Sequence, residues 1–126
     1  MPKEVIRTTD APSSPLYSQG VKAGPFVYVT GMWGVDTKTG EFAGPTVREQ
    51  ARQALINCEN ILRAAGATRD DVVAVHVLLA RAGDFDAFNQ EYAMFFTAEP
   101  PIRYVSKLGA ELPEMLVSIT MTAMTG

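Results

Sequence analysis

The sequence contains few of the residues that most often carry metal or covalent chemistry. Among its 126 residues there is one cysteine, Cys58, and one histidine, His76. A single cysteine excludes an intrachain disulfide, and one cysteine with one histidine leaves too few soft ligands for a structural zinc site. We therefore expect no metal site.

Apolar runs of membrane-spanning length and an excess of basic residues are also absent. No segment approaches the roughly 20 apolar residues that cross a bilayer, and the first residues show no signal-peptide pattern. The formal net charge is −3, from 11 basic and 14 acidic residues. Such a balance does not attract a phosphate backbone. These absences predict a cytoplasmic protein with neither a membrane nor a nucleic acid among its partners.

Three motifs are missing as well: a glycine-rich phosphate loop, the HExxH metal motif and the G-x-S-x-G nucleophile turn. Their absence argues against the common cofactor enzymes and predicts no cofactor. What is present is an ordinary globular composition, with 47% apolar and 20% charged residues. A chain of this length is expected to form one domain, residues 1–126, around one core.

The apolar pattern predicts strands at both ends of the chain and one in the middle. Short runs rich in β-branched, aromatic or other apolar residues predict strands at 4–8, 17–24, 26–30, 102–108 and 115–124. A turn is expected at 36–40. The nearly uninterrupted apolar run 72–80 is typical of a strand buried on both faces. Within it, Val73, Val75 and Val77 form an apolar face that needs a partner, which favours an oligomer.

Two amphipathic helices are predicted between these strands. The first begins at the capping-box pair Thr46 and Glu49 and ends at Gly66. Asp84 is expected to cap the second, an aromatic-rich helix that continues to the breaker Pro100-Pro101. The order β-β-β-α-β-α-β-β predicts an α+β two-layer domain, in which one antiparallel or mixed sheet packs against two helices.

Arg103 is the strongest functional candidate found from chemistry alone. It opens an apolar strand, where a permanently charged guanidinium needs a partner, and its fork of donors suits a carboxylate. An intrachain ion pair with one of the acidic residues explains it equally well. By contrast, we interpret His76, inside an apolar strand, and Cys58, on the apolar stripe of the first helix, as core or interface residues.

Several short motifs occur together in the order and spacing of a known family. They are Ala11-Pro12, Tyr17-Ser18-Gln19-Gly20, Val29-Thr30-Gly31, the turn 36–40, the N-x-x-Y-x-x-F-F run from Asn89 to Phe96, and Pro101-Ile102-Arg103. Over nearly the whole chain the sequence resembles the Rid/YjgF family of reactive intermediate deaminases. The resemblance implies a chorismate mutase-like fold, a homotrimer and a binding cleft at each subunit interface.

The resemblance also implies roles for individual residues. In deaminating members an arginine holds the carboxylate of a 2-imino or 2-enamino acid, and here Arg103 takes that role beside the backbone of Val105. Four other positions match residues that line the family's cleft. Tyr17 matches the cleft tyrosine, and Thr30 matches a small residue with a hydroxyl group. Gly31 matches the residue whose backbone helps to place the water, and Asn89 matches the asparagine on the second helix. Hydrolysis of an imine needs little acid–base machinery, because the protonated C=N group is already electrophilic.

The chain departs from the family at three places. Deaminating members generally carry a glutamate on the last strand that hydrogen-bonds the attacking water, and Thr120 stands there instead. A hydroxyl can orient water but is a poor proton acceptor. The stretch after Arg103 is one residue longer than usual, which predicts a bulge in that strand. Trp33 and Phe88 predict a more aromatic cleft or, alternatively, fill the trimer interface.

The leading functional hypothesis is an enamine/imine deaminase, a hydrolase with Arg103, Tyr17 and Thr120 as its catalytic residues. Its substrate would be a small carboxylate-bearing 2-imino or 2-enamino acid, or an aminomuconate-like derivative. The alternative is a trimer that binds a small molecule with little or no catalysis, because Thr120 replaces the glutamate. The endoribonuclease activity claimed for some relatives is disfavoured by the acidic charge balance.

Overall fold

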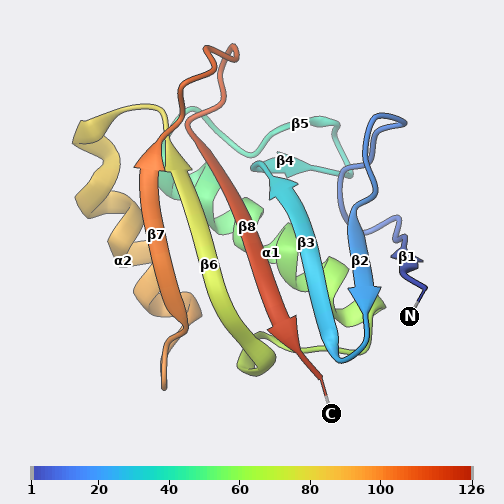
Figure 1. The fold of residues 1–126 in the computed structure, drawn as a ribbon. Coiled ribbons are helices and arrows are strands. Elements are labelled where there is room, and N and C mark those ends of the chain that lie inside the picture. Colours follow the sequence, from blue (N-terminus) through green and yellow to red (C-terminus); the bar gives the residue numbers. More distant parts are fainter. Residues whose placement is uncertain (1, 126) are drawn as a thin grey trace.

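Six strands form one mixed sheet, and two helices cover one of its faces (Figure 1). The structure is a computed structural model that describes residues 2–125. Across the sheet within this range, the strand order is β1 (Glu4–Ile6), β2 (Gly20–Ala23), β3 (Phe26–Met32), β8 (Val117–Met124), β6 (Val72–Leu79) and β7 (Ile102–Lys107). Only β6 and β7 are parallel among these neighbours. The predicted α+β fold, with a mixed sheet against two helices, is confirmed.

The predicted turn at 36–40 joins a short hairpin that the sequence pattern did not reveal. Its strands, β4 (Val35–Asp36) and β5 (Glu41–Phe42), have two residues each, too few for a periodic signal. The Asp36 carboxylate accepts a hydrogen bond from the backbone N–H of Lys38 at 2.8 Å. Gly40 has a φ of +74°, a conformation that glycine adopts without strain.

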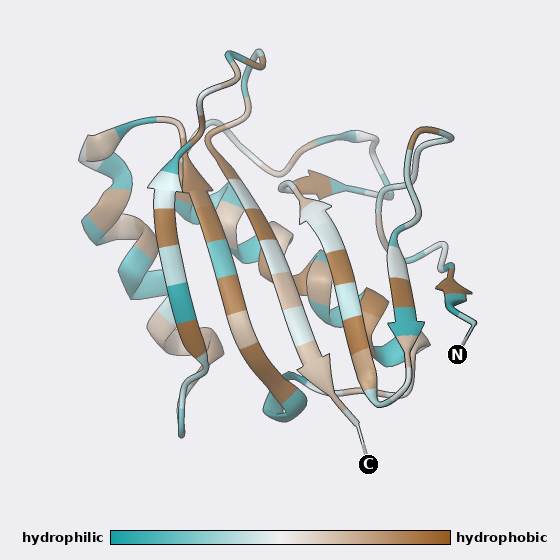
Figure 2. Ribbon diagram, viewed as in Figure 1, coloured by the Kyte–Doolittle hydropathy of each residue, from teal (hydrophilic) through white to brown (hydrophobic). Residues whose placement is uncertain are grey.

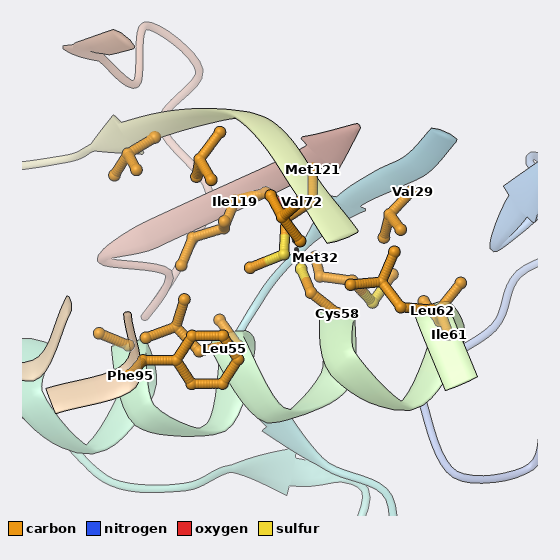
Figure 3. Close-up of a cluster of buried hydrophobic side chains, with 14 of the residues drawn as sticks. Val29, Met32, Leu55, Cys58, Ile61, Leu62, Val72, Phe95, Ile119 and Met121 are labelled. Carbon is orange, nitrogen blue, oxygen red and sulfur yellow. Dashed lines mark hydrogen bonds between the residues drawn. The ribbon is translucent and has the colours of Figure 1, made fainter. Parts of the chain in front are cut away.

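Helix α1 (Val47–Ala64) begins as its capping pattern predicted. The Thr46 hydroxyl accepts a hydrogen bond from the backbone N–H of Glu49 at 3.3 Å and donates one to the Glu49 carboxylate at 2.7 Å. Gly66, with a φ of +83°, follows the end of the helix. The apolar stripe of α1 faces the sheet, as Figure 3 shows for Leu55 and Cys58.

Helix α2 (Phe85–Phe95) follows two 3₁₀ turns, η1 (Arg69–Asp71) before β6 and η2 (Ala82–Asp84) after it. Asp84 occupies the N-cap position, but its carboxylate does not cap the helix; instead it binds the Arg81 guanidinium at 3.0 Å. The helix also ends before Pro100-Pro101, because the chain turns away after Phe95. No helix in the described part of the chain is long and apolar enough to cross a membrane.

Strand β6 is buried on one face only, which corrects the prediction of a strand buried on both. Val75 and Val77 are buried under the helices, whereas Val73 is 44% exposed on the opposite face. An irregularity between Val72 and Ala74 in the pairing with β8 breaks the alternation, so Val73 does not share a face with Val75. Val75 and Val77 were expected to need a partner chain to cover them, but the helices of the same chain cover both.

The bulge predicted after Arg103 is absent, because β7 pairs with β6 in unbroken register from Ile102 to Lys107. The chain then continues into the loop 108–116, which leads to β8. Gln50 of α1 ties this loop down: its side-chain amide donates to the Glu114 carbonyl at 2.8 Å and accepts from the backbone N–H of Leu116 at 2.9 Å. Glu114 itself has a φ of +67°.

Candidate functional site

The Arg103 side chain lies on the helix-covered side of the sheet, at its β7 edge. Arg103 pairs with the buried Val75, and its guanidinium carbon lies 4.9 Å from the ring centroid of Tyr92 and 5.8 Å from that of Phe85, both on α2. None of the ion pairs within residues 2–125 includes Arg103. The intrachain ion pair offered as an alternative is therefore not formed there, and the half-buried cation has its donors free.

Two polar atoms on the neighbouring face of α2 are also without partners. The Asn89 Oδ1 atom and the Tyr92 hydroxyl are buried and make no hydrogen bond within the described residues. Burial raises the pKa of Tyr92, and the positive charge of Arg103 lowers it by less, so the phenol stays protonated and able to donate. An unsatisfied buried polar atom costs about 1–3 kcal/mol, which is recovered when a ligand or water pairs with it.

Tyr92 was missed as a site residue by the sequence analysis. It was interpreted only as part of the apolar pattern of the second helix, yet it follows Asn89 by three residues, a spacing that places both side chains on one face of a helix. The three-residue spacing from Asn89 is therefore the sequence signal that identifies Tyr92 as a candidate site residue.

Thr30, Gly31 and Thr120 lie together on the opposite side of the sheet, which we call the open face because neither helix covers it. In the pairing of β3 with β8, Thr30 and Gly31 stand opposite Thr120 alone, in a bulge between Val29 and Met32. A Cβ atom on Gly31 would lie 3.1 Å from Ser118 Oγ and 3.7 Å from Thr120 Cγ2. Glycine at this position keeps the backbone beside Thr120 accessible.

Tyr17 lies half-buried in the loop before β2, and burial raises the pKa of its hydroxyl. It lines an open hollow of about 820 Å³ between this loop and the first strand. The loop is held by the buried Gln19, whose amide nitrogen donates to the carbonyls of Ala11 and Pro12 at 3.0 Å each. The Gln19 carbonyl in turn accepts from the backbone N–H of Thr30 at 2.9 Å, which connects the loop to the bulge.

Gln19 is a supporting residue that the analysis quoted within a motif without assigning it a role. Its side chain also pairs with both backbone groups of Thr8, accepting from the N–H at 2.8 Å and donating to the carbonyl at 2.9 Å. A buried side chain that pairs with several backbone groups of residues 8–12 in this way fixes the distance between that segment and Gln19.

The remaining predicted residues, Val105, Trp33 and Phe88, differ in how deeply they are buried. Val105 lies half-buried on the same face of β7 as Arg103. Trp33 is partly buried, and its indole N–H has no partner among the described residues. Phe88 is 0% exposed, in the core of the chain beside Tyr92. The prediction that Phe88 lines a cleft or an interface is wrong, because the side chain points from α2 into the core.

A single chain does not bring the two groups of residues together. Thr120 pairs with His76 on the open face, whereas Arg103 pairs with Val75 on the helix-covered face. The sheet itself therefore separates Arg103, Val105 and Asn89 from Thr30, Gly31 and Thr120. One site that uses both groups needs two chains.

Comparison with known proteins gives consistent matches over almost the full length. The family described as endoribonuclease L-PSP matches residues 8–125. A RutC family protein of Saccharolobus solfataricus is 40% identical over 123 residues, which are 96% of this chain and 97% of that protein. A mouse protein named 2-iminobutanoate/2-iminopropanoate deaminase is 36% identical over 125 residues, which are 98% of this chain and 93% of that protein. The crystal structure of E. coli TdcF with bound serine superimposes with a TM-score of 0.91 at 30% identity and covers 98% of this chain and 99% of that one.

Proposed function

Because this chain belongs to the Rid/YjgF family, whose members are also described as RutC or endoribonuclease L-PSP proteins, we propose that it is a deaminase that hydrolyses a small 2-imino or 2-enamino acid. The observation that carries the proposal is the Arg103 guanidinium, half-buried and without a carboxylate partner among residues 2–125. A free, partly desolvated guanidinium suits the carboxylate that all such substrates carry.

The groups around Arg103 complement the rest of such a substrate. The Tyr92 hydroxyl, a buried donor without a partner, can bind the second carboxylate oxygen. Asn89 Oδ1, a buried acceptor, can bind an N–H of the protonated imine. The Val105 backbone lies on the same strand two residues beyond Arg103 and completes the carboxylate subsite. The serine-bound TdcF structure supports this assignment, since serine carries a carboxylate and a nitrogen on one carbon.

The water-binding half of the site comes, in this proposal, from the open face of a second chain. That face carries several exposed apolar side chains: Phe26, Tyr28, Val73, Ile102, Tyr104 and Met124. In Figure 2 the open face is toward the viewer and the helices lie behind, and the ribbon colours show apolar and polar residues alternating along the central strands. Such a surface favours association. A homotrimer would place Tyr17, Thr30, Gly31 and Thr120 of each subunit against Arg103 of the next, with Trp33 near the boundary.

In this proposal the site has mainly to orient the substrate and the attacking water. Arg103, Tyr92 and Asn89 hold the iminium acid in one orientation, and the Gly31 backbone and the Thr120 hydroxyl hold the water. Orientation of this kind supplies much of the acceleration in reactions between a bound substrate and a placed nucleophile. The products are a 2-oxo acid and ammonium.

The test is the rate of ammonia release from 2-imino acids generated in the assay by an amino acid oxidase, above the rate in buffer. The wild-type protein is expected to accelerate release, and Arg103→Ala is expected to abolish the acceleration. Equal rates for wild type, Arg103→Ala and buffer with every imino acid would contradict the proposal.

A second candidate is a trimer that binds a carboxylate ligand without turning it over. The observation that favours it is the chemistry of the open face around Gly31, where Thr120 and Ser118 supply hydroxyls in place of a carboxylate. Calorimetry separates the two candidates: a protein that binds 2-oxobutyrate through Arg103 but releases no ammonia from the imino acids is the binding protein.

A further inference from the structure

Two arginines, Arg7 and Arg103, have no hydrogen-bond or ion-pair partner among residues 2–125. The other arginines each contact a carboxylate or an amide side chain of the same chain: Arg48, Arg52, Arg63, Arg69 and Arg81. An arginine without an acidic partner in its own chain has all its donors available to an anion from outside. Arg103 is already assigned to a carboxylate, whereas Arg7 has no role in the proposed site.

Arg7 lies directly after β1, in the loop 7–19 that leads to β2 (Figure 1). Its side chain lines the same open hollow of about 820 Å³ as Tyr17. Within the described part of the chain, Arg7 is the one charged residue in this lining, and no carboxylate belongs to it. Several other lining residues carry hydroxyl groups: Thr8, Thr9, Ser13, Ser14 and Ser18. A hollow with one guanidinium, hydroxyl donors and no acidic group suits an anion.

Two of these hydroxyls are held so that their hydrogen atoms remain free. The Thr8 hydroxyl oxygen accepts a hydrogen bond from the backbone N–H of Asp10 at 3.1 Å. The Ser14 hydroxyl oxygen accepts one from the backbone N–H of Leu16, also at 3.1 Å. Because each oxygen already acts as an acceptor, its O–H group is left to donate. Both hydroxyls can therefore add donors to an anion bound by Arg7.

The hollow has one wall on the open face of the sheet. Val5, which lines it, pairs with Val21 of β2, and Val21 pairs with Tyr28 of β3. Side chains directly opposite one another on neighbouring strands point to the same face, and Tyr28 is exposed on the open face. The hollow therefore borders the surface that meets a second chain in the proposed trimer, and Arg7 accompanies Tyr17 to that boundary.

We propose that Arg7 binds a second carboxylate, so that the substrate is a 2-imino or 2-enamino dicarboxylic acid. This inference rests on the proposed deaminase function, in which Tyr17 of one subunit lies against Arg103 of the next. In that arrangement Arg103 binds the carboxylate beside the C=N carbon, and Arg7 of the neighbouring subunit binds the carboxylate at the far end. A monocarboxylic substrate would leave Arg7 without a partner, whereas a dicarboxylic one pairs both free arginines. The hydrolysis itself is unchanged, and its products are a 2-oxo diacid and ammonium.

The first experiment compares kcat/KM for three imino acids generated in the assay by oxidases: 2-iminosuccinate, 2-iminoglutarate and 2-iminobutanoate. The wild type is expected to favour at least one of the two diacids by about tenfold or more. Arg7→Gln is expected to lower kcat/KM for that diacid by about tenfold, mainly through KM, because a charge-assisted pair is lost. The same variant should change kcat/KM for 2-iminobutanoate by less than about twofold.

Lys22→Gln is the matched control for the loss of a positive charge. Lys22 lies on β2, next to β1, but does not line the hollow. This variant is expected to leave the preference for the diacid at its wild-type value. Equal losses for the diacid and for 2-iminobutanoate in Arg7→Gln would indicate a merely structural role and overturn the proposal. An unchanged rate with the diacid in Arg7→Gln would overturn it as well.

A second experiment tests whether the two arginines that bind one diacid come from different chains. Arg103→Ala chains and Arg7→Gln chains are refolded together in equal amounts, and native mass spectrometry verifies that they have mixed. If each site takes Arg103 from one chain and Arg7 from the next, random assembly restores about one quarter of the wild-type sites. We expect about that fraction of the wild-type rate with the diacid. A rate no higher than the mean of the two separate variants would overturn the shared site.

The outcomes separate this inference from the function on which it depends. If the wild type deaminates 2-iminobutanoate, Arg103→Ala does not, and neither diacid is preferred, the deaminase stands and the role of Arg7 is refuted. If the wild type releases no ammonia above buffer from any imino acid, the deaminase is refuted, and calorimetry tests Arg7 by itself. Arg7→Gln should then raise the Kd of 2-oxoglutarate or oxaloacetate and leave that of 2-oxobutyrate unchanged. Equal Kd values for wild type and Arg7→Gln with both diacids would refute the second carboxylate site.

Discussion

The guanidinium carbon of Arg103 lies 4.9 Å from the centroid of the Tyr92 ring, within cation–π distance. The ring holds the cation from one side and leaves its N–H donors free, since none of the hydrogen bonds or ion pairs between described side chains uses them. An arginine held in this way is ordered before a ligand arrives. Pre-ordering reduces the entropy lost on binding.

Arg103→Lys is expected to weaken the binding of 2-oxobutyrate almost as much as Arg103→Ala, because a lysine cannot reproduce the bidentate fork. Hydrogen bonds to charged groups contribute about 1.5–3 kcal/mol, so both variants should raise Kd by about tenfold or more in calorimetry. Arg63→Lys, an exposed change on α1, serves as the control. Wild-type affinity for 2-oxobutyrate in Arg103→Lys would show that a positive charge alone is enough to bind the carboxylate.

Tyr92→Phe is expected to separate stability from binding. Removing a buried hydroxyl without a partner relieves a desolvation cost, so the free energy of unfolding in urea should stay constant or rise by about 1 kcal/mol. Ligand affinity should fall about fivefold, because a donor to the carboxylate is lost. A destabilised Tyr92→Phe protein would mean that the hydroxyl is paired in solution.

Gly31→Ala is expected to reduce turnover because the added Cβ lies 3.1 Å from Ser118 Oγ, and either the bulge or that side chain must shift. A stability loss of about 1–2 kcal/mol should accompany the lower kcat. Gly83→Ala is the matched control, since a Cβ there meets nothing within 4 Å and should change stability by less than about 0.5 kcal/mol. Unchanged kcat in Gly31→Ala would exclude a role for this backbone in placing water.

Gln19→Leu is expected to loosen the loop that carries Tyr17. The change keeps the volume but removes the side-chain hydrogen bonds to the backbone of Thr8, Ala11 and Pro12. The free energy of unfolding should fall by about 2–4 kcal/mol, because several buried backbone groups lose their partner. Proteolysis should become faster within this loop. Gln90→Leu, at an exposed position on α2, should leave both measurements near the wild-type values.

The open face is expected to be an interface, so sedimentation should give the mass of three chains at micromolar concentration. Ile102→Lys, which places a charge at a 62% exposed apolar position on this face, should shift the mass toward one chain. Met94→Lys is the control, because Met94 is 61% exposed but lies on α2, away from the open face. A wild-type protein that sediments as a monomer would contradict the trimer and the shared site together.

The elements that the sequence predicted well are those whose signals are local. The capping pair Thr46 and Glu49 and the following apolar stripe specify α1, because a helix is built from contacts three and four residues apart. The motifs quoted for the family named Arg103, Tyr17 and Asn89 as candidate site residues without any structure, and their roles stay predictions. Cys58 was expected in the core and is fully buried there.

The tertiary structure decided what depends on pairing between distant strands. The irregularity between Val72 and Ala74 turned Val73 to the open face, and no local pattern marks it. The same registers placed Arg103 and Thr120 on opposite faces of one sheet, although the sequence analysis assigned both to one site. Strand order and register are set by the packing of the whole sheet, and a shift of one residue exchanges its two faces. The sequence by itself therefore determined which residues are candidates for chemistry, and only the fold decided which of them can meet within one chain and which need a second.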